Sequence, residues 1–538
     1  TVQVSPYVDT SSEGTETVIL TLLAGTGYVL GPTTSASVAI ANSPGTLYVS
    51  NLRPASGTNG QVGSGLASIV LSADGTFATV NVSFSNLGSG QAGAHLFLGD
   101  STSAGDYVLN LPLGQVTGVQ WDIQSTGTYS AAQILDALKS GRIYVGIDTA
   151  NYPAGELRGS FLSAAGSQAF VAPAAPPAVS TSAMTATDAA RLLTQATFGP
   201  KRSEIDALVN TSVDAWITAQ FAVPPTDFRA AELEEFAYQR TVNPDLREFD
   251  NFQPFKQRAW FRVIPFANDQ LRQRVAFALS QILVIGDNGL NAGQTEGAAN
   301  YWDLLAKNAF GNFRTLLEQV TLNPIMGSYL SSLRNARADP LLGTNPDENF
   351  AREIMQLFTV GLVQLQPDGT LKLDAAGLPI PTYNQSTITE TAKVFTGWGF
   401  FSTAPNPNFR RGPMNNIDPM MLYPTFHESG SKTIINNLVI PANLGGTEDL
   451  KRTLDALFNH ENTPPFICRQ LIQRLVTANP SPGYVHRVAQ KFINNGSGVR
   501  GDLGAVVRAL LTDYEARSAT AAAFPGFGKL KEPLLRYT

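Results

Sequence analysis

The stretch that decides the fold of the larger part of this chain is residues 345–361, NPDENFAREIMQLFTVG. Asn345 is a favoured helix cap, Pro346 suits the first helical position, Glu348 takes the capping-box position and Gly361 suits a helix end. The stripe residues recur at the three- and four-residue spacing of one helix face: Phe350, Ile354, Leu357, Phe358 and Gly361. The pattern predicts an amphipathic helix from Pro346 to Gly361.

The opposite face of this predicted helix carries Asn349, Arg352, Glu353 and Gln356. An ordinary surface helix would show Lys and Glu there. Two amides, a guanidinium and a carboxylate instead suit a partly buried polar network or a binding site. In the structural alternative, Arg352 and Glu353 hold neighbouring helices together as paired charges.

The same helical period extends outward over residues 184–538. Asn268 can cap a helix that ends at Gly286, and Thr387 with Glu390 form a capping-box pattern ahead of a helix that ends at Gly397. We therefore expect a large, mainly α-helical domain over residues 184–538.

The N-terminal part alternates with the period of two that is typical of strands. Residues 1–43 predict the last strands of a sandwich, and residues 44–163 predict a β-sandwich with one helix, capped by Ser130. Residues 164–183 are rich in Ala, Pro and Ser and predict a linker. The fold class is therefore multidomain, with all-β sandwich modules followed by a mainly α-helical domain.

Composition narrows the classes of function. The chain has 538 residues, a net charge of −6 and only 15% charged residues, without a Lys/Arg cluster, which argues against nucleic-acid binding. Its apolar runs are too short to span a membrane. The single Cys468 lies on a helical pattern and predicts a packed thiol. Because Thr1 is not an initiator Met and opens a strand-like run, we expect a processed or excised fragment.

Several segments of the helical part resemble a large bacterial family, domain of unknown function (DUF) family 1800. The segments are residues 349–361, 189–199, 271–281 and 395–398, together with 426–428. The resemblance spans nearly all of residues 184–538. It implies a secreted bacterial protein and no particular reaction. Members of the family usually continue past the point matching residues 529–533, so we expect this chain to end early at Thr538.

Residues 47–159 resemble a CHRD (chordin-type) domain, most specifically at the ending YPAGELRG, residues 152–159. His95 lacks the second His two residues later that the family often has, so we expect a structural His and no metal site. Residues 1–43 resemble the end of a Calx-beta domain, a family whose acidic loops can bind calcium. Glu13 and Glu16 fall far short of the six to eight oxygens of a calcium site, so calcium is only a weak expectation and no other cofactor is expected.

The candidate site centres on the polar helix face. Glu353 and His427 could supply a general base and its partner, and Arg352 an anion clamp. The candidate binding residues are Asn349, Gln356, Trp398 and Lys432. The sequence has no Gly-x-Ser-x-Gly elbow, no His-Glu-x-x-His and no phosphate-binding loop.

Two functions stay open, and whether the chain is an enzyme is uncertain. The first is a secreted or cell-surface binding or structural protein whose partner is an extracellular polymer, a surface protein or another copy of itself. The second is a secreted hydrolase that acts on an extracellular polymer through Glu353, Arg352 and His427. A nucleic-acid partner is not expected.

Overall fold

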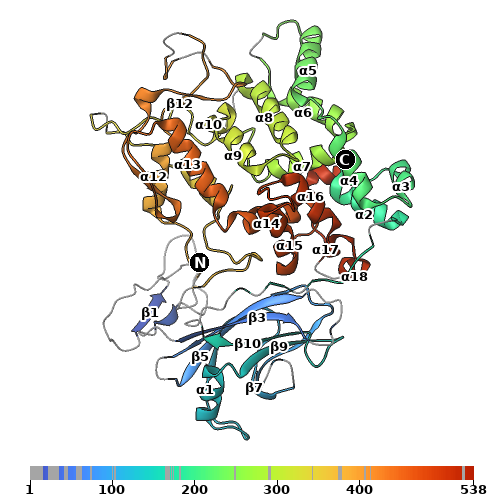
Figure 1. Cartoon of the computed structure of the whole chain (residues 1–538), viewed down its shortest axis with the longest axis vertical. Helices are drawn as coiled ribbons and strands as arrows, with labels where there is room; N and C mark the ends of the chain where they lie inside the picture. Colours follow the sequence, from blue (N-terminus) through green and yellow to red (C-terminus); the bar gives the residue numbers. More distant parts are fainter. Residues whose placement is uncertain are drawn as a thin grey trace. The chain divides into compact units, whose positions relative to one another are not determined.

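The computed structural model (Figure 1) forms two compact units, residues 1–169 with 373–378, and residues 170–372 with 379–538. The structure describes residues 16–21, 35–40, 46–55, 58, 63–72, 75–99, 101, 104–163, 170, 172–173, 175–180, 183–247, 250–288, 292–341, 343–373, 379–404, 408–411, 414–523 and 527–537. Glu13, named above for a calcium site, lies outside the described residues.

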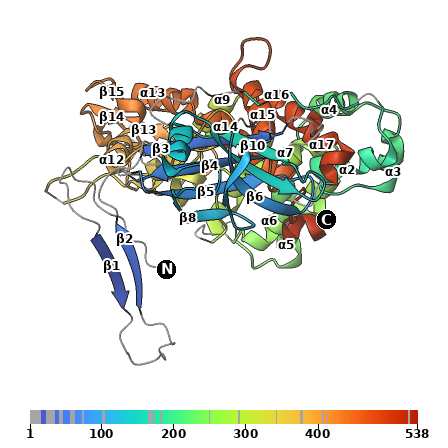
Figure 2. The same ribbon diagram turned by 90° about the horizontal axis from the view of Figure 1, so that it is seen from below.

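The N-terminal unit is built from antiparallel strands. β1 (Glu16–Thr21) and β2 (Ser35–Ile40) pair as a separate two-stranded ribbon (Figure 2). The other strands form one sheet in the order β7-β6-β9-β10-β3-β4-β5-β8, and β11 also pairs with β3. Their bounds are β3 Thr46–Pro54, β4 Ser64–Leu71, β5 Phe77–Ser85, β6 Gln91–Leu98, β7 Asp106–Asn110, β8 Val116–Asp122, β9 Ile143–Thr149, β10 Leu157–Ser160 and β11 Leu162–Ser163.

Buried and partly exposed residues alternate along strands such as β5, which gives the sheet an apolar face that packs on a core. Val80 and Val82 of β5 are buried, while the alternate residues Thr79 and Asn81 are partly exposed. Side chains from both halves of the sheet, such as Ile69, Val80 and Trp121 on one side and Leu96 and Val145 on the other, share one hydrophobic cluster. The helix α1 (Ala131–Lys139) begins after Ser130, whose side chain and Gln133 form a capping box, as predicted.

The second unit is mainly helical, as predicted. Its helices are α2 Ala186–Ala196, α3 Arg202–Leu208, α4 Val213–Ala222, α5 Phe228–Val242, α6 Gln253–Val263, α7 Gln270–Ser280, α8 Thr295–Lys307, α9 Phe313–Thr321, α10 Pro324–Tyr329, α11 Asn349–Gln356, α12 Gln385–Val394, α13 Gly446–Asn459, α14 Thr463–Leu475, α15 Pro482–Ile493, α16 Leu503–Thr512, α17 Tyr514–Arg517, α18 Ala519–Ala522 and α19 Pro533–Tyr537. Short 3-10 helices cover Ile264–Phe266, Ala292–Gln294, Pro424–Phe426 and Ile435–Asn437. Two small antiparallel sheets interrupt the helices, β12 (Trp398–Gly399) with β13 (Met421–Leu422) and β14 (Lys432–Ile434) with β15 (Leu438–Ile440).

The predicted bounds of the signature helix were wrong. α11 begins at Asn349 rather than Pro346, because Asn335 holds the preceding segment as a loop: its side chain donates to Asp347 O (3.0 Å) and accepts from Asp347 N (2.9 Å). The helix ends at Gln356 rather than Gly361. The next residues form a turn in which Gly361, at φ +73°, donates to Met355 O.

The ends of two other helices also differ from the prediction. α7 begins after Asp269 rather than after Asn268. It ends at Ser280 rather than at Gly286, and in the segment that follows the helix Tyr301 donates to Leu283 O at 2.6 Å. α12 is capped by Asn384, whose side chain accepts from Thr387 N at 3.0 Å, so Thr387 lies inside the helix and is not its cap.

Candidate functional site

On the polar face of α11, Arg352 belongs to a network that joins α11 to α12. Its Nη2 donates to Glu348 Oε2 at 3.3 Å, and Glu348 also accepts from Gln385 Nε2 and Thr389 Oγ1, each at 2.7 Å. Arg352 and Glu348 are partly exposed, at 39% and 30% of their side chains. The guanidinium is therefore held in place from both helices.

Glu353, the next residue, keeps a polar atom without a partner. Its buried Oε2 and the hydroxyl of Tyr383 make no hydrogen bond in the described part of the chain. Burial raises the pKa of the Glu353 carboxyl, although the charge of Arg352 opposes the shift. Burial also raises the pKa of Tyr383, and the charge of Glu353 adds to that shift. The raised pKa favours the protonated form of the Glu353 carboxyl, which a general acid requires, whereas the raised pKa of Tyr383 keeps its hydroxyl protonated.

His427 and Lys432 belong to a different and deeply buried group. His427 Nε2 lies 3.0 Å from Asp449 Oδ2, and its Nδ1 lies 2.9 Å from Thr396 O. Lys432 Nζ donates to Asp449 Oδ2 at 2.6 Å and to the carbonyls of Glu428 and Gly430 at 2.7 and 2.9 Å. His427, Lys432 and Asp449 are 4%, 1% and 2% exposed, so this cluster fastens the 427–432 segment to the first turn of α13.

The two groups lie at opposite ends of α12. Tyr383, next to Glu353, precedes the helix, whereas Thr396, which contacts His427, follows it. Ten helical residues span roughly 14 Å, so the structure does not bring Glu353 and His427 together. Of the other candidates, Asn349 is exposed and Gln356 is half-buried, while Trp398 is buried on β12 with its Nε1 unpartnered in the described part of the chain.

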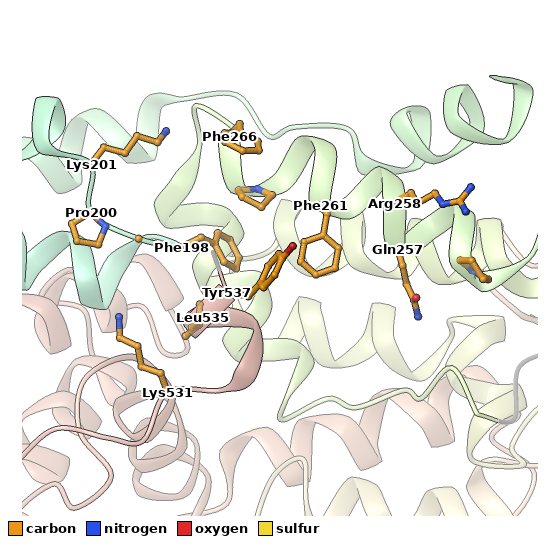
Figure 3. A pocket seen from close by; sticks show the side chains of 13 residues that line it. Phe198, Pro200, Lys201, Gln257, Arg258, Phe261, Phe266, Lys531, Leu535 and Tyr537 are labelled. Carbon is orange, nitrogen blue, oxygen red and sulfur yellow. The ribbon is translucent and has the colours of Figure 1, made fainter. Parts of the chain in front are cut away.

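A cleft of about 970 Å³ lies elsewhere on the helical unit (Figure 3). In the view of Figure 3, the rings of Phe198, Tyr537 and Phe261 occupy its centre, Lys201 and Lys531 lie at the left end, and Gln257 and Arg258 lie at the right. The complete lining is Phe198, Gly199, Pro200, Lys201, Pro254, Gln257, Arg258, Phe261, Pro265, Phe266, Lys531, Leu535 and Tyr537. It comes from the segment between α2 and α3, from α6 with the 3-10 helix after it, and from α19 with the segment before it.

The lining of the cleft is aromatic and basic. It includes three cations, Lys201, Arg258 and Lys531, and no carboxylate. Lys201 forms an exposed ion pair of 3.4 Å with Glu204 outside the lining and lies 5.7 Å from the centroid of Phe266. Burial lowers the pKa of Lys531. Phe266 and Tyr537 are 68% and 83% exposed, so their rings are open to a ligand.

No local sequence motif marks this cleft, because its lining combines Phe198 with Lys531, more than 300 positions away in the sequence. Phe198 and Lys531 fall inside segments that carry the family resemblance, but nothing in those segments shows that they meet.

The described residues show no group of three or more His, Cys, Asp and Glu side chains placed to hold a metal. His95 is half-buried, with Nε2 3.1 Å from Asp148 Oδ2 and Nδ1 2.9 Å from Asn110 Oδ1. Its ring is thus engaged by protein side chains. Within the described part of the chain, no helix is both long and apolar enough to cross a membrane.

Comparison with known proteins finds two families. The model of DUF1800, described as a protein of unknown function, matches residues 191–538, which is more than half of the chain. The model of the CHRD domain matches residues 46–161. No curated protein and no solved structure matches the chain.

Proposed function

The chain belongs to the DUF1800 family, which is described only as a protein of unknown function, so we infer its function from the cleft. We propose that it is a secreted protein whose helical unit binds an acidic polysaccharide, one that contains uronic acids, in the cleft of Figure 3. In this proposal the CHRD unit and the Calx-beta-like strands space and attach the helical unit outside the cell. The observation that carries it is the lining, with open aromatic rings between cations and no carboxylate.

Two physical features favour this ligand. Exposed rings such as Phe266 and Tyr537 offer flat apolar surfaces on which the C–H faces of a sugar can stack. Cations at both ends of the cleft, Lys201 and Lys531 at one and Arg258 at the other, suit an extended chain that carries repeated carboxylates. In a chain with a net charge of −6, a cleft of this sign selects anions locally.

The test uses calorimetry to measure how tightly the full chain binds an oligouronate and a neutral glucan of equal length. We expect affinity for the oligouronate only, weakened by salt. F261A and R258Q should each lower the affinity about tenfold, which corresponds to about 1.4 kcal/mol. R202Q is the matched control, because Arg202 pairs with Asp206 at 3.0 Å outside the lining. Equal binding of both sugars, or tight binding of an acidic peptide alone, would refute the proposal.

The unpartnered Glu353 Oε2 and Tyr383 hydroxyl favour a second candidate, hydrolysis of such a polymer with Glu353 as the acid. His427 would take no part, since it contacts the other end of α12. Release of reducing ends from a uronate polymer, abolished by E353Q without loss of binding in the cleft, is the expected result. Hydrolysis that survives E353Q would exclude this role.

A further inference from the structure

Four cations gather where α7 and α14 meet the segment before α19. Arg274 comes from α7 and Arg474 from α14, and Lys529 and Lys531 come from the segment together with the single carboxylate Glu532. Arg274 is 1% exposed and is among the largest fully buried side chains in the described part of the chain. Its burial is unusual, because an Arg is almost never fully buried unless it is paired.

The hydrogen bonds of the cluster leave donors unused. Arg274 Nη2 donates to Arg474 O at 2.6 Å, and Lys529 Nζ donates to the same carbonyl at 2.8 Å and to Glu532 Oε1 at 2.7 Å. Arg274 Nε and Nη1 and Arg474 Nε are buried without a partner in the described part of the chain. The ring of Phe277, 5.6 Å from the Arg274 guanidinium, offers only a weak cation–π contact.

The charges of the cluster do not balance. Glu532 supplies one negative charge. The carbonyls at the ends of α7 and α14 that accept from Arg474 and Lys529 add about half a charge each. Four cations therefore keep an excess of roughly two positive charges. Burial lowers the pKa of Arg274 to about 10, which still leaves the guanidinium charged at neutral pH.

Lys531 connects this cluster to the cleft. It lines the cleft in Figure 3. Burial is the larger cause of its lowered pKa, and the charge of Arg274 lowers the pKa further. Lys531 therefore belongs both to the lining of the cleft and to the cluster.

We propose that Arg274, Arg474 and Lys529 form a binding site for an oxyanion, which reaches them from the cleft past Lys531. The oxyanion is a carboxylate or a phosphate. Its carboxylate form rests on the proposed function, since a uronate of the bound polymer would supply it, whereas free inorganic phosphate needs no polymer. An oxyanion here would accept from the buried N–H groups and neutralise the excess charge.

The experiment follows thermal unfolding of the full chain by circular dichroism at 222 nm. Sodium phosphate, or a short oligouronate, is titrated against sodium chloride at equal ionic strength. We expect at least one of the two oxyanions to raise Tm saturably by about 3 °C. A rise with phosphate alone identifies a free-anion site, and a rise with the uronate alone identifies the polymer as the source.

The variants separate a site from a structural role. R274M should lose the oxyanion-dependent rise in Tm and, without oxyanion, should be no less stable than the parent chain, because it removes an unpaired buried charge. R272M is the matched control two residues away on α7, where Arg272 donates to Val223 O at 3.2 Å. It should lower Tm and keep the rise. If R274M does not fold, K529M replaces it as the test variant and must abolish the oxyanion-dependent rise in Tm.

The site is refuted if neither oxyanion raises Tm above chloride, or if R274M and K529M both keep the full rise. Failure of the two proposals is distinguishable. A phosphate-dependent rise that requires Arg274 in a chain without affinity for oligouronate would reject the polymer and retain the site.

Discussion

Breaking the buried cluster of Lys432, Asp449 and His427 is expected to cost a large part of the stability of the helical unit. Lys432→Met removes an ammonium with three acceptors. It leaves the carbonyls of Glu428 and Gly430 without that donor, while Asp449 Oδ2 keeps its contact of 3.0 Å with His427 Nε2. Asp449→Asn removes the carboxylate that pairs with Lys432, which is 1% exposed.

Removal of one partner from a buried pair costs about 3–5 kcal/mol, because the other charge stays buried without compensation. We expect a loss of that size from each single variant. In the double variant K432M/D449N both charges are removed, so neither is left buried without its partner. The loss should therefore fall short of the sum of the two single losses by about 2 kcal/mol or more.

The assay is urea unfolding of the full chain, followed by circular dichroism at 222 nm, which reports chiefly on the helical unit. R452M is the control on the same helix, because the Arg452–Glu448 pair of 2.8 Å is exposed at 43% and 41%. Its loss should stay below about 1 kcal/mol. The reasoning fails if K432M and D449N each cost no more than this control, or if their losses simply add.

Three further predictions follow from buried groups and backbone. Burial raises the pKa of Glu515 from 4.5 to about 7, so the folded chain holds a proton there that the unfolded chain releases. The free energy of unfolding should fall by up to about 3 kcal/mol between about pH 4.5 and 7, and E515Q should flatten that slope, as measured by urea unfolding at each pH. Cys468 is fully buried and burial raises its pKa, so a thiol reagent should label it only in denaturant; rapid labelling of the folded chain would contradict this. G397A should lower the free energy of unfolding by more than about 2 kcal/mol in the same assay, because a Cβ would lie 2.9 Å from His427 N. The control G445A lies at a similar positive φ in open space and should cost about 1 kcal/mol. Equal losses would show that only φ matters.

Much of the candidate site could not be predicted from the sequence, as Arg352, Glu353 and His427 illustrate. Helical spacing marked Arg352 and Glu353 as polar residues beside a buried stripe, and the structure places both at the α11–α12 contact. The same reasoning grouped His427 with them, although His427 packs at the far end of α12. Periodicity orders residues around one helix, but it carries no information on which end of a neighbouring helix a distant loop contacts.

The sequence by itself determined the strand-rich start, the helical remainder and most of the apolar faces, because a period of two or of 3.6 is set by local backbone geometry. Leu357 of the predicted stripe is the exception, since it follows the end of α11 and is 41% exposed. The sequence also indicated that Cys468 is packed. Only the tertiary structure decided the helix ends, where Asn335 and Tyr301 take up backbone groups. It alone brought Lys531 together with Arg274 and Phe198, from which it is more than 250 positions away in the sequence. Attraction and desolvation depend on distance in space, and residues so far apart in the sequence acquire that distance only when the chain folds.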